Sequence, residues 1–157
     1  DISAKKDGQH IEICKTNGYA CFSGIWNGTH IIEIDLDIKP YWISANTNVR
    51  ADVGKVALMK GPCVYCLEEK DNGENLASVY VSSGCRLNEQ EPMSGMFGEL
   101  PTIEYTGTRL YNEGVKDDEL YGKPIFKEKE VKLKAIPYCI WGNRGQGEML
   151  VWQKVRL

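Results

Sequence analysis

The sequence predicts an all-β protein, an antiparallel β-sandwich with part of a preceding β-sandwich domain at the N-terminus. Three observations lead to this fold class. Apolar residues recur with a period of two rather than 3.6. The candidate strands are short and are separated by clusters of Gly, Pro, Asn and Asp. No segment offers a convincing helical face of ten or more residues. Many short strands with turn signals between them are typical of sandwiches.

The clearest alternation is HIIEIDLDI, residues 30–38, in which Ile32, Ile34 and Leu36 would share one face. The preceding segment YACFSGIW, residues 19–26, also has strand character. Asn27-Gly28 lies between them, and Asn-Gly is the dipeptide best suited to a type I′ turn. We therefore expect 19–26 and 30–38 to pair as an antiparallel hairpin.

The rest of the chain carries further short strands. They are predicted at 55–59, 63–69, 78–82, 102–106, 131–136, 138–141 and 149–154. The polar segment ISANTNVRADVG between the first hairpin and the next strand has the composition of a connector, so a domain boundary is expected near Ala51. Residues 1–51 would be the last strands of an incomplete first β-sandwich domain, and residues 52–157 a second, complete one.

Composition excludes several classes of protein. The 157 residues can bury one core, and the formal charge is −3 with basic residues scattered along the chain. No nucleic acid partner is therefore expected. No apolar run approaches the roughly 20 residues that cross a bilayer, so no membrane partner is expected either. We expect a cytoplasmic protein, although the chain begins without Met, as a fragment or a processed product does.

The motif CVYC places Cys63 and Cys66 three residues apart inside a strand-like run. Side chains at that separation point to opposite faces of a sheet, so the two thiols cannot chelate one metal from a regular strand. A zinc site would need two more ligands, and only His10 and His30 are available as histidines. We expect no metal site and no cofactor in this chain, and the six cysteines to be free thiols.

Two other groups of residues have the composition of possible sites. The stripe of Glu33, Asp35 and Asp37 is interpreted as a solvated strand face, because no apolar pocket is at hand to raise a carboxyl pKa. The loop GNRGQGE, residues 142–148, is interpreted as a tight hairpin rather than a phosphate cradle, because strands and not a helix flank it. Its Arg144 is a candidate for pairing with a carboxylate of a neighbouring domain. No catalytic residue is predicted.

Aromatic residues supply the alternative function, a carbohydrate-binding β-sandwich module. Most of them lie in apolar strands, where an aromatic side chain is usually part of the core. Tyr41 and Trp42 follow Pro40 at a strand end and are the candidates for stacking on a sugar.

Two long motifs resemble a known family. They are VGKVALMKGPCVYCLEE followed by DNGENL, and LKAIPYCIWGNRGQGEMLVW near the C-terminus. They are similar, in order and spacing, to the C-terminal region of the β-L-arabinofuranosidases, the glycoside hydrolase family 127-like enzymes. The earlier GYACFSGIWNGTHIIEIDLDI resembles the strands just before that region.

The resemblance implies a non-catalytic, C-terminal β-sandwich portion of a bacterial glycoside hydrolase. In that family a large α/α barrel carries catalysis, with a cysteine nucleophile, a zinc site and glutamates, and two β-sandwich domains follow it. No matching catalytic motif occurs here. Cys66 matches a cysteine of the sandwich motif, while Cys63 and Cys139 stand where apolar or bulky residues are expected. The implied partner is the protein's own barrel, with a homo-oligomer as a further option.

Overall fold

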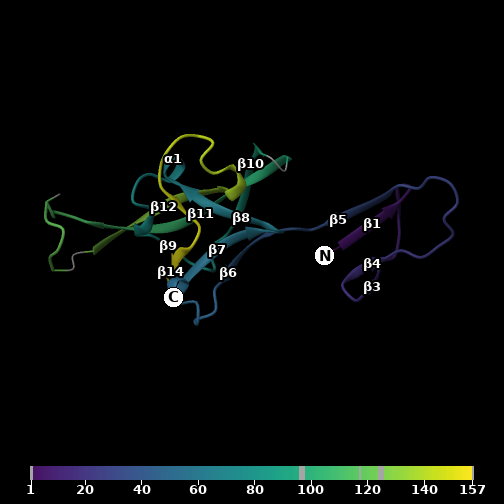
Figure 1. The fold of residues 1–157 in the computed structure, drawn as a ribbon, viewed down its shortest axis with the longest axis horizontal. Coiled ribbons are helices and arrows are strands. Elements are labelled where there is room, and N and C mark those ends of the chain that lie inside the picture. The colour runs from purple at the N-terminus through teal and green to yellow at the C-terminus, as the bar shows by residue number, and fades with distance from the viewer. Residues whose placement is uncertain (1, 96–97, 117, 124–125, 157) are drawn as a thin grey trace. The chain divides into compact units, whose positions relative to one another are not determined.

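The computed structural model describes residues 2–95, 98–116, 118–123 and 126–156. The chain divides into two compact units, residues 1–38 and 39–157, which are described separately. The prediction of an all-β protein is confirmed, because strands dominate both units (Figure 1). Among the described residues the only α-helix is the four-residue α1 (Glu69–Asn72). No helix in this part of the chain is long and apolar enough to cross a membrane.

Unit 1 contains a three-stranded sheet and a separate two-stranded ribbon. The sheet has the order β2-β1-β5, and the ribbon pairs β3 with β4. The bounds are β1 (Ile2–Lys6), β2 (Gln9–His10), β3 (Cys14–Thr16), β4 (Tyr19–Cys21) and β5 (Ile32–Leu36).

The predicted hairpin between residues 19–26 and 30–38 is wrong. β5 pairs with β1, with Ile34 opposite Ala4. Two hydrogen bonds fix this register at one end, since Asp7 N donates to Ile31 O and Ile31 N donates to Asp7 Oδ1, both at 2.9 Å. The type I′ turn is made by Asn17-Gly18 instead of Asn27-Gly28. Asn17 and Gly18 have the required positive φ angles of 51° and 83°, and they join β3 to β4.

The apolar alternation of β5 does not lead to a buried face in unit 1. Ile34 and Leu36 are about half exposed, and Ile38 after the strand is exposed as well. Ala4 is the buried apolar residue of the described part of this unit. Within the described residues of unit 1 the three strands do not bury a core, and the incompleteness of this domain stays a prediction.

Unit 2 is built on a nine-stranded sheet. All its pairings are antiparallel except the parallel contact between β14 and β9. Its strands are β6 (Pro40–Ser44), β7 (Lys55–Lys60), β8 (Cys63–Glu68), β9 (Val79–Val81), β10 (Asn88–Gly95), β11 (Gly98–Asn112), β12 (Phe126–Pro137), β13 (Met149–Leu150) and β14 (Gln153–Val155). The short 3-10 turns η1 (Arg50–Asp52), η2 (Leu76–Ser78) and η3 (Tyr138–Ile140) connect them.

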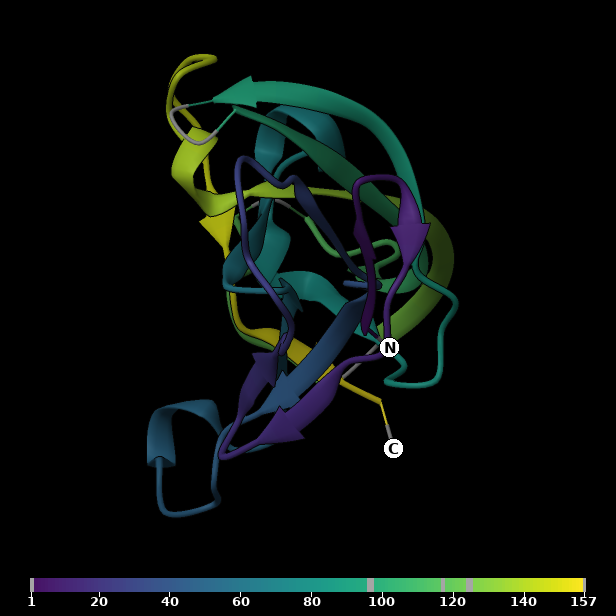
Figure 2. The ribbon, with the colours of Figure 1, turned by 90° about the vertical axis from the view of Figure 1, so that its right-hand side faces the viewer.

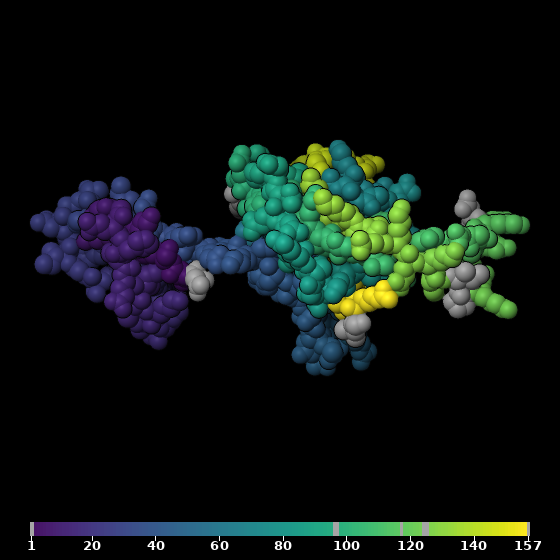
Figure 3. Space-filling view, turned by 180° about the vertical axis from the view of Figure 1, so that it is seen from behind, coloured from purple at the N-terminus to yellow at the C-terminus, as the bar shows by residue number. Residues whose placement is uncertain are grey.

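The strand order closes on itself. It runs β8-β12-β11-β9-β14-β7, and β7 returns to β8 through a hairpin. Strands β10 and β11 bend together over one side of the unit (Figure 2), while the ends of β11 and β12 stand out from its body (Figure 3). The core lies inside this curved sheet and includes Leu58, Tyr65, Leu67, Ile103 and Leu133. The two layers of the predicted sandwich are thus joined into one continuous sheet.

The border between the units lies between Ile38 and Lys39, whereas the sequence predicts a boundary near Ala51. The reason is β6, which pairs with β7 along its whole length, from Pro40 opposite Lys60 to Ser44 opposite Val56. The polar segment before Val56 is therefore the connection between two paired strands of one domain.

Two predicted strands near the C-terminus differ from the structure. Residues 138–141 begin with the turn η3, which Pro137 precedes, rather than a strand. Residues 149–154 contain two strands with different partners, since β13 pairs with β8 and β14 with β7 and β9. The loop GNRGQGE therefore joins η3 to β13 and is not a hairpin between two paired strands.

Candidate functional site

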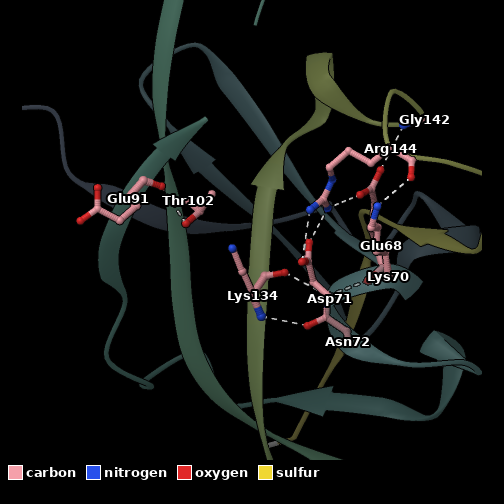
Figure 4. A network of polar contacts seen from close by, with 9 residues as sticks. All are labelled: Glu68, Lys70, Asp71, Asn72, Glu91, Thr102, Lys134, Gly142 and Arg144. Atoms are coloured by element: carbon pink, nitrogen blue, oxygen red, sulfur yellow. Dashed lines mark hydrogen bonds and ion pairs between the residues drawn. The ribbon is translucent and has the colours of Figure 1, made fainter. Parts of the chain in front are cut away.

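The best-defined polar site lies where the loop of residues 142–148 meets the end of β8 and the helix α1 (Figure 4). The guanidinium of Arg144 forms ion pairs with the carboxylates of Glu68 and Asp71. Its Nη1 also donates to Asp71 Oδ1 at 3.2 Å. Glu68 is buried, and its Oε1 accepts a hydrogen bond of 3.0 Å from Gly142 N. One arginine thereby fastens the loop to two consecutive elements.

The electrostatics of this cluster favour a permanently charged Arg144. The hydrogen bond that Arg144 donates to Asp71 raises the pKa of the guanidinium, burial lowers it, and the hydrogen bond to Glu68 and the charge of Glu68 raise it again. An arginine is protonated at any physiological pH, so the cluster holds a fixed cation between two carboxylates. Such a group suits a structural role. It cannot serve as a general acid or base near neutral pH.

The glycines of the loop allow backbone conformations and close contacts that other residues would not, and they do not form a phosphate site. Gly142 and Gly145 have φ angles of 81° and 124°, which L side chains rarely adopt. A Cβ on Gly147 would lie 3.2 Å from the Cβ of Glu69. The cavity beneath the loop measures about 20 Å³, room for one water molecule and not for a phosphate group.

The sequence pattern does not indicate the role of Asn72, which lies at the end of α1. Its Nδ2 donates to the carbonyls of Glu68 at 2.8 Å and Lys134 at 3.0 Å, and its Oδ1 accepts from Lys134 N at 2.8 Å (Figure 4). The side-chain amide thus pairs with β12 as a strand backbone would, next to the point where β8 leaves it. The signal available in the sequence was Asn72-Gly73, which marks a chain reversal.

An exposed aromatic pair lies beside this cluster. Tyr138 and Trp141 stack with ring centroids 6.0 Å apart and an interplanar angle of 20°. They are 44% and 42% exposed. Trp141 also lines the small cavity under the Arg144 loop. Stacked rings in solvent are a common form of contact surface for another protein segment or a sugar.

Arg144, predicted to contact a neighbouring domain, has its carboxylate partners within unit 2. An additional contact outside this chain stays a prediction.

Tyr41 and Trp42, predicted to stack on a sugar, occupy neighbouring positions of β6, so their side chains point to opposite faces. Trp42 packs against the core and meets Tyr105 edge to face, with centroids 5.2 Å apart. Tyr41 is exposed. The two rings therefore do not form one platform, and sugar binding by Tyr41 stays a prediction.

The CVYC pair lies on the regular strand β8, as predicted. Cys66 is fully buried, and burial raises the pKa of its thiol to about 12. All six cysteines are free in the structure. No group of three or more His, Cys, Asp and Glu side chains suited to a metal ion occurs among the described residues. One of the two histidines, His30, bonds through Nδ1 to Asp7 Oδ2 at 2.7 Å.

This fold and this site define an all-β domain, and the polar cluster around Arg144 fastens a loop of that same domain. Residues 40–154 match the family model described as the glycoside hydrolase family 127 C-terminal domain. The chain belongs to this family.

Relatives of known structure and function agree with this assignment. A curated relative, the non-reducing end β-L-arabinofuranosidase of Bifidobacterium longum, is 30% identical over 132 residues, 78% of this chain and 19% of that protein. The crystal structure of a GH127 β-L-arabinofuranosidase from Geobacillus stearothermophilus T6 is similar with a TM-score of 0.82 and 33% identity. It matches 99% of this chain, which covers 25% of that one. The structure of a second GH127 β-arabinofuranosidase is similar with a TM-score of 0.82 and 27% sequence identity. The match covers 99% of this chain and 23% of that one.

Proposed function

We propose that this chain is the non-catalytic C-terminal portion of a glycoside hydrolase and that it supports and docks on the catalytic part of the same protein. The main support for this proposal is the family match over residues 40–154. In addition, this chain spans only about a fifth to a quarter of the length of its relatives. The internal pairing of the charged cluster around Arg144 supports a structural role. The catalytic partner would be the α/α barrel implied by the resemblance, with the family's zinc site on that barrel.

We assign the docking contact to the stacked pair Tyr138 and Trp141. The pair is solvent-exposed, and the turn η3 that presents it is anchored by the buried side chain of Ile140. The neighbouring loop is held rigid by Arg144, Glu68 and Asp71. A rigid aromatic pair loses little conformational entropy on contact, so it suits a permanent interface between domains.

The whole protein would release terminal β-L-arabinofuranose from glycans, as the name of the Bifidobacterium relative, a non-reducing end β-L-arabinofuranosidase, says of that enzyme. We further propose a cytoplasmic location. As an additional option, the chain would self-associate through the exposed face of β5, and analytical sedimentation of this chain would test that.

The test compares this chain, the whole protein and a whole protein that ends before Lys39. This chain alone should not hydrolyse an aryl β-L-arabinofuranoside, whereas the whole protein should. Removing residues 39–157 should lower the thermal midpoint of the catalytic part. Turnover by this chain alone would overturn the non-catalytic assignment, and a shortened protein of undiminished stability would overturn the supporting role.

A point variant addresses the docking contact itself. Trp141→Ala in the whole protein should lower its thermal midpoint by several degrees, but should leave the midpoint of the isolated chain nearly unchanged. The matched control is Tyr121→Ala, because Tyr121 is 96% exposed and lies away from this loop in sequence. Equal effects of Trp141→Ala in both proteins would show that the ring stabilises only its own domain.

A further inference from the structure

The ribbon of β3 and β4 places two cysteines directly opposite each other. Its register pairs Thr16 with Tyr19, Lys15 with Ala20 and Cys14 with Cys21. The turn Asn17-Gly18 fixes this register, because a two-residue type I′ turn leaves no freedom to slide one strand along the other. Cross-strand partners project to the same face, so the two thiols are neighbours.

Both thiols can be reached from solvent. Cys14 and Cys21 are exposed, and both line an open cleft of about 480 Å³ whose wall also contains Ile11, Phe22 and Trp26. Cys14 Sγ lies 3.6 Å from Thr16 Oγ1, which is a weak contact that a rotation about χ1 would release. Neither thiol fills a core. Cys66, by contrast, is fully buried in β8.

The geometry permits a bond between them. Cys14 and Cys21 lie at a hydrogen-bonded pair of the ribbon, where directly opposed Cβ atoms are about 5.5 Å apart, and a disulfide needs about 3.5–4.5 Å. The ribbon must therefore close by roughly 1–2 Å. A two-stranded ribbon outside the main sheet of its unit can make that adjustment, since no third strand pairs with it among the described residues.

We propose that Cys14 and Cys21 are a redox-active pair that forms a reversible disulfide by exchange with a small-molecule disulfide of the glutathione type. One cysteine thiolate attacks a sulfur of the small disulfide and releases one small thiol. The second cysteine thiolate then attacks the protein sulfur of the mixed disulfide and releases the other. Two protein thiols are oxidised to one disulfide, the small disulfide is reduced to two thiols, and the two protons from the cysteines pass to the released thiolates.

The bond would change the stability of the ribbon. A two-stranded hairpin is marginal in water, and a cross-link between its strands removes open conformations from the ensemble. Oxidation should therefore slow the opening of the β3–β4 ribbon, and reduction should restore it. The stability of the β3–β4 ribbon would therefore depend on the ratio of small-molecule disulfide to thiol in the surrounding solution.

The experiment treats the full 157-residue chain with oxidised glutathione at a pH near 8 and maps the cysteines by peptide mass spectrometry. We expect one intramolecular disulfide joining Cys14 to Cys21, while buried Cys66 stays reduced in the folded protein. Hydrogen exchange of the Thr16 and Tyr19 amides, which lie at a hydrogen-bonded pair of the ribbon, should slow about tenfold or more on oxidation. Dithiothreitol should reverse both effects.

Cys14→Ser and Cys21→Ser are the matched controls. Each should leave the remaining cysteine of the pair as a mixed disulfide with glutathione, with no change in ribbon exchange. Cys14→Ala provides a second variant should the serine disturb the ribbon. The proposal is overturned if Cys14 and Cys21 of the unmutated chain stay reduced, carry separate glutathione adducts, or bond to other cysteines.

Discussion

The hydroxyl of Tyr105 donates a hydrogen bond of 2.9 Å to Oε1 of Gln153 inside the closed sheet of unit 2. Both side chains are buried, and they come from β11 and β14. Burial raises the pKa of Tyr105, so its hydroxyl stays protonated and can donate at every pH at which the protein is folded. This bond ties the C-terminal strand to the centre of the sheet.

Tyr105→Phe should lower the free energy of unfolding by about 1–3 kcal/mol, because Gln153 would keep a buried carbonyl oxygen without a donor. Gln153 Nε2 already lacks a partner in the structure, so the amide has no second bond to compensate. Urea unfolding followed by Trp fluorescence measures the change. In the double variant Tyr105→Phe with Gln153→Met the loss should be smaller, since the orphaned amide is gone. A fully stable Tyr105→Phe protein would mean that water reaches Gln153.

Arg144→Met should destabilise the chain by about 3 kcal/mol, since it leaves the buried carboxylate of Glu68 without its cation. Arg144→Lys should recover only part of this, because an ammonium group cannot reach Glu68 and Asp71 with the planar fork of a guanidinium.

The matched control is Lys132→Met, which removes the cation of an exposed ion pair. Lys132 Nζ lies 2.7 Å from Glu104 Oε2, and its side chain is 76% exposed. Pairs of this kind contribute about 0–1 kcal/mol. Thermal or urea unfolding of the two variants should therefore separate them clearly, and equal losses would show that the Arg144 cluster is hydrated like a surface pair.

Strands with a clear local pattern could be predicted from the sequence. The strands with which they pair could not. β7 and β8 follow from two apolar runs joined by Gly61-Pro62, and the structure pairs them as a hairpin. For β5 the alternation is equally clear, but the strand pairs with β1 far upstream. Two Asn-Gly dipeptides compete for the turn, and local sequence does not decide which one is used.

The site shows the same limit. Arg144 was recognisable as an arginine in need of a carboxylate, yet its partners Glu68 and Asp71 lie more than seventy residues away in the chain. Only the meeting of the 142–148 loop with β8 and α1 brings them together. Residues 138–141 form a short apolar run, for which periodicity cannot distinguish a strand from a turn.

Gly107→Ala should destabilise unit 2 by about 1–3 kcal/mol through overpacking. A Cβ at this position of β11 would lie 2.5 Å from Leu133 Cδ1 and 2.9 Å from the carbonyl oxygen of Tyr80. The leucine could rotate, but the backbone of the neighbouring strand β9 cannot move without loosening the sheet.

Gly122→Ala is the control for Gly107→Ala, because a Cβ there meets no atom within 4 Å. Its unfolding midpoint in urea should match that of the unmutated chain within error. A tolerated Gly107→Ala would indicate that β9 is able to shift away from β11.

The two units should differ in hydrogen exchange, with strong protection at residues 131–136 and weaker protection at residues 11–38. The first segment belongs to β12, which pairs with β11 along its length and with β8 near its end. Leu133 and Ala135 are buried there, so their amides open only when unit 2 unfolds as a whole. The second segment includes the isolated ribbon and β5 with its exposed apolar face, so its amides can open locally.

Exchange should be measured on the monomer at low protein concentration, because self-association would cover the face of β5 and slow exchange there. The region of β6 around Trp42 provides an internal reference. Because β6 pairs with β7 in unit 2, its amides should exchange as slowly as those of residues 131–136. Residues 40–44 exchanging as slowly as 131–136 would support a border at Ile38. Uniform protection of the whole monomer, including residues 11–38, would instead show that unit 1 is a complete structural unit with a stability of its own.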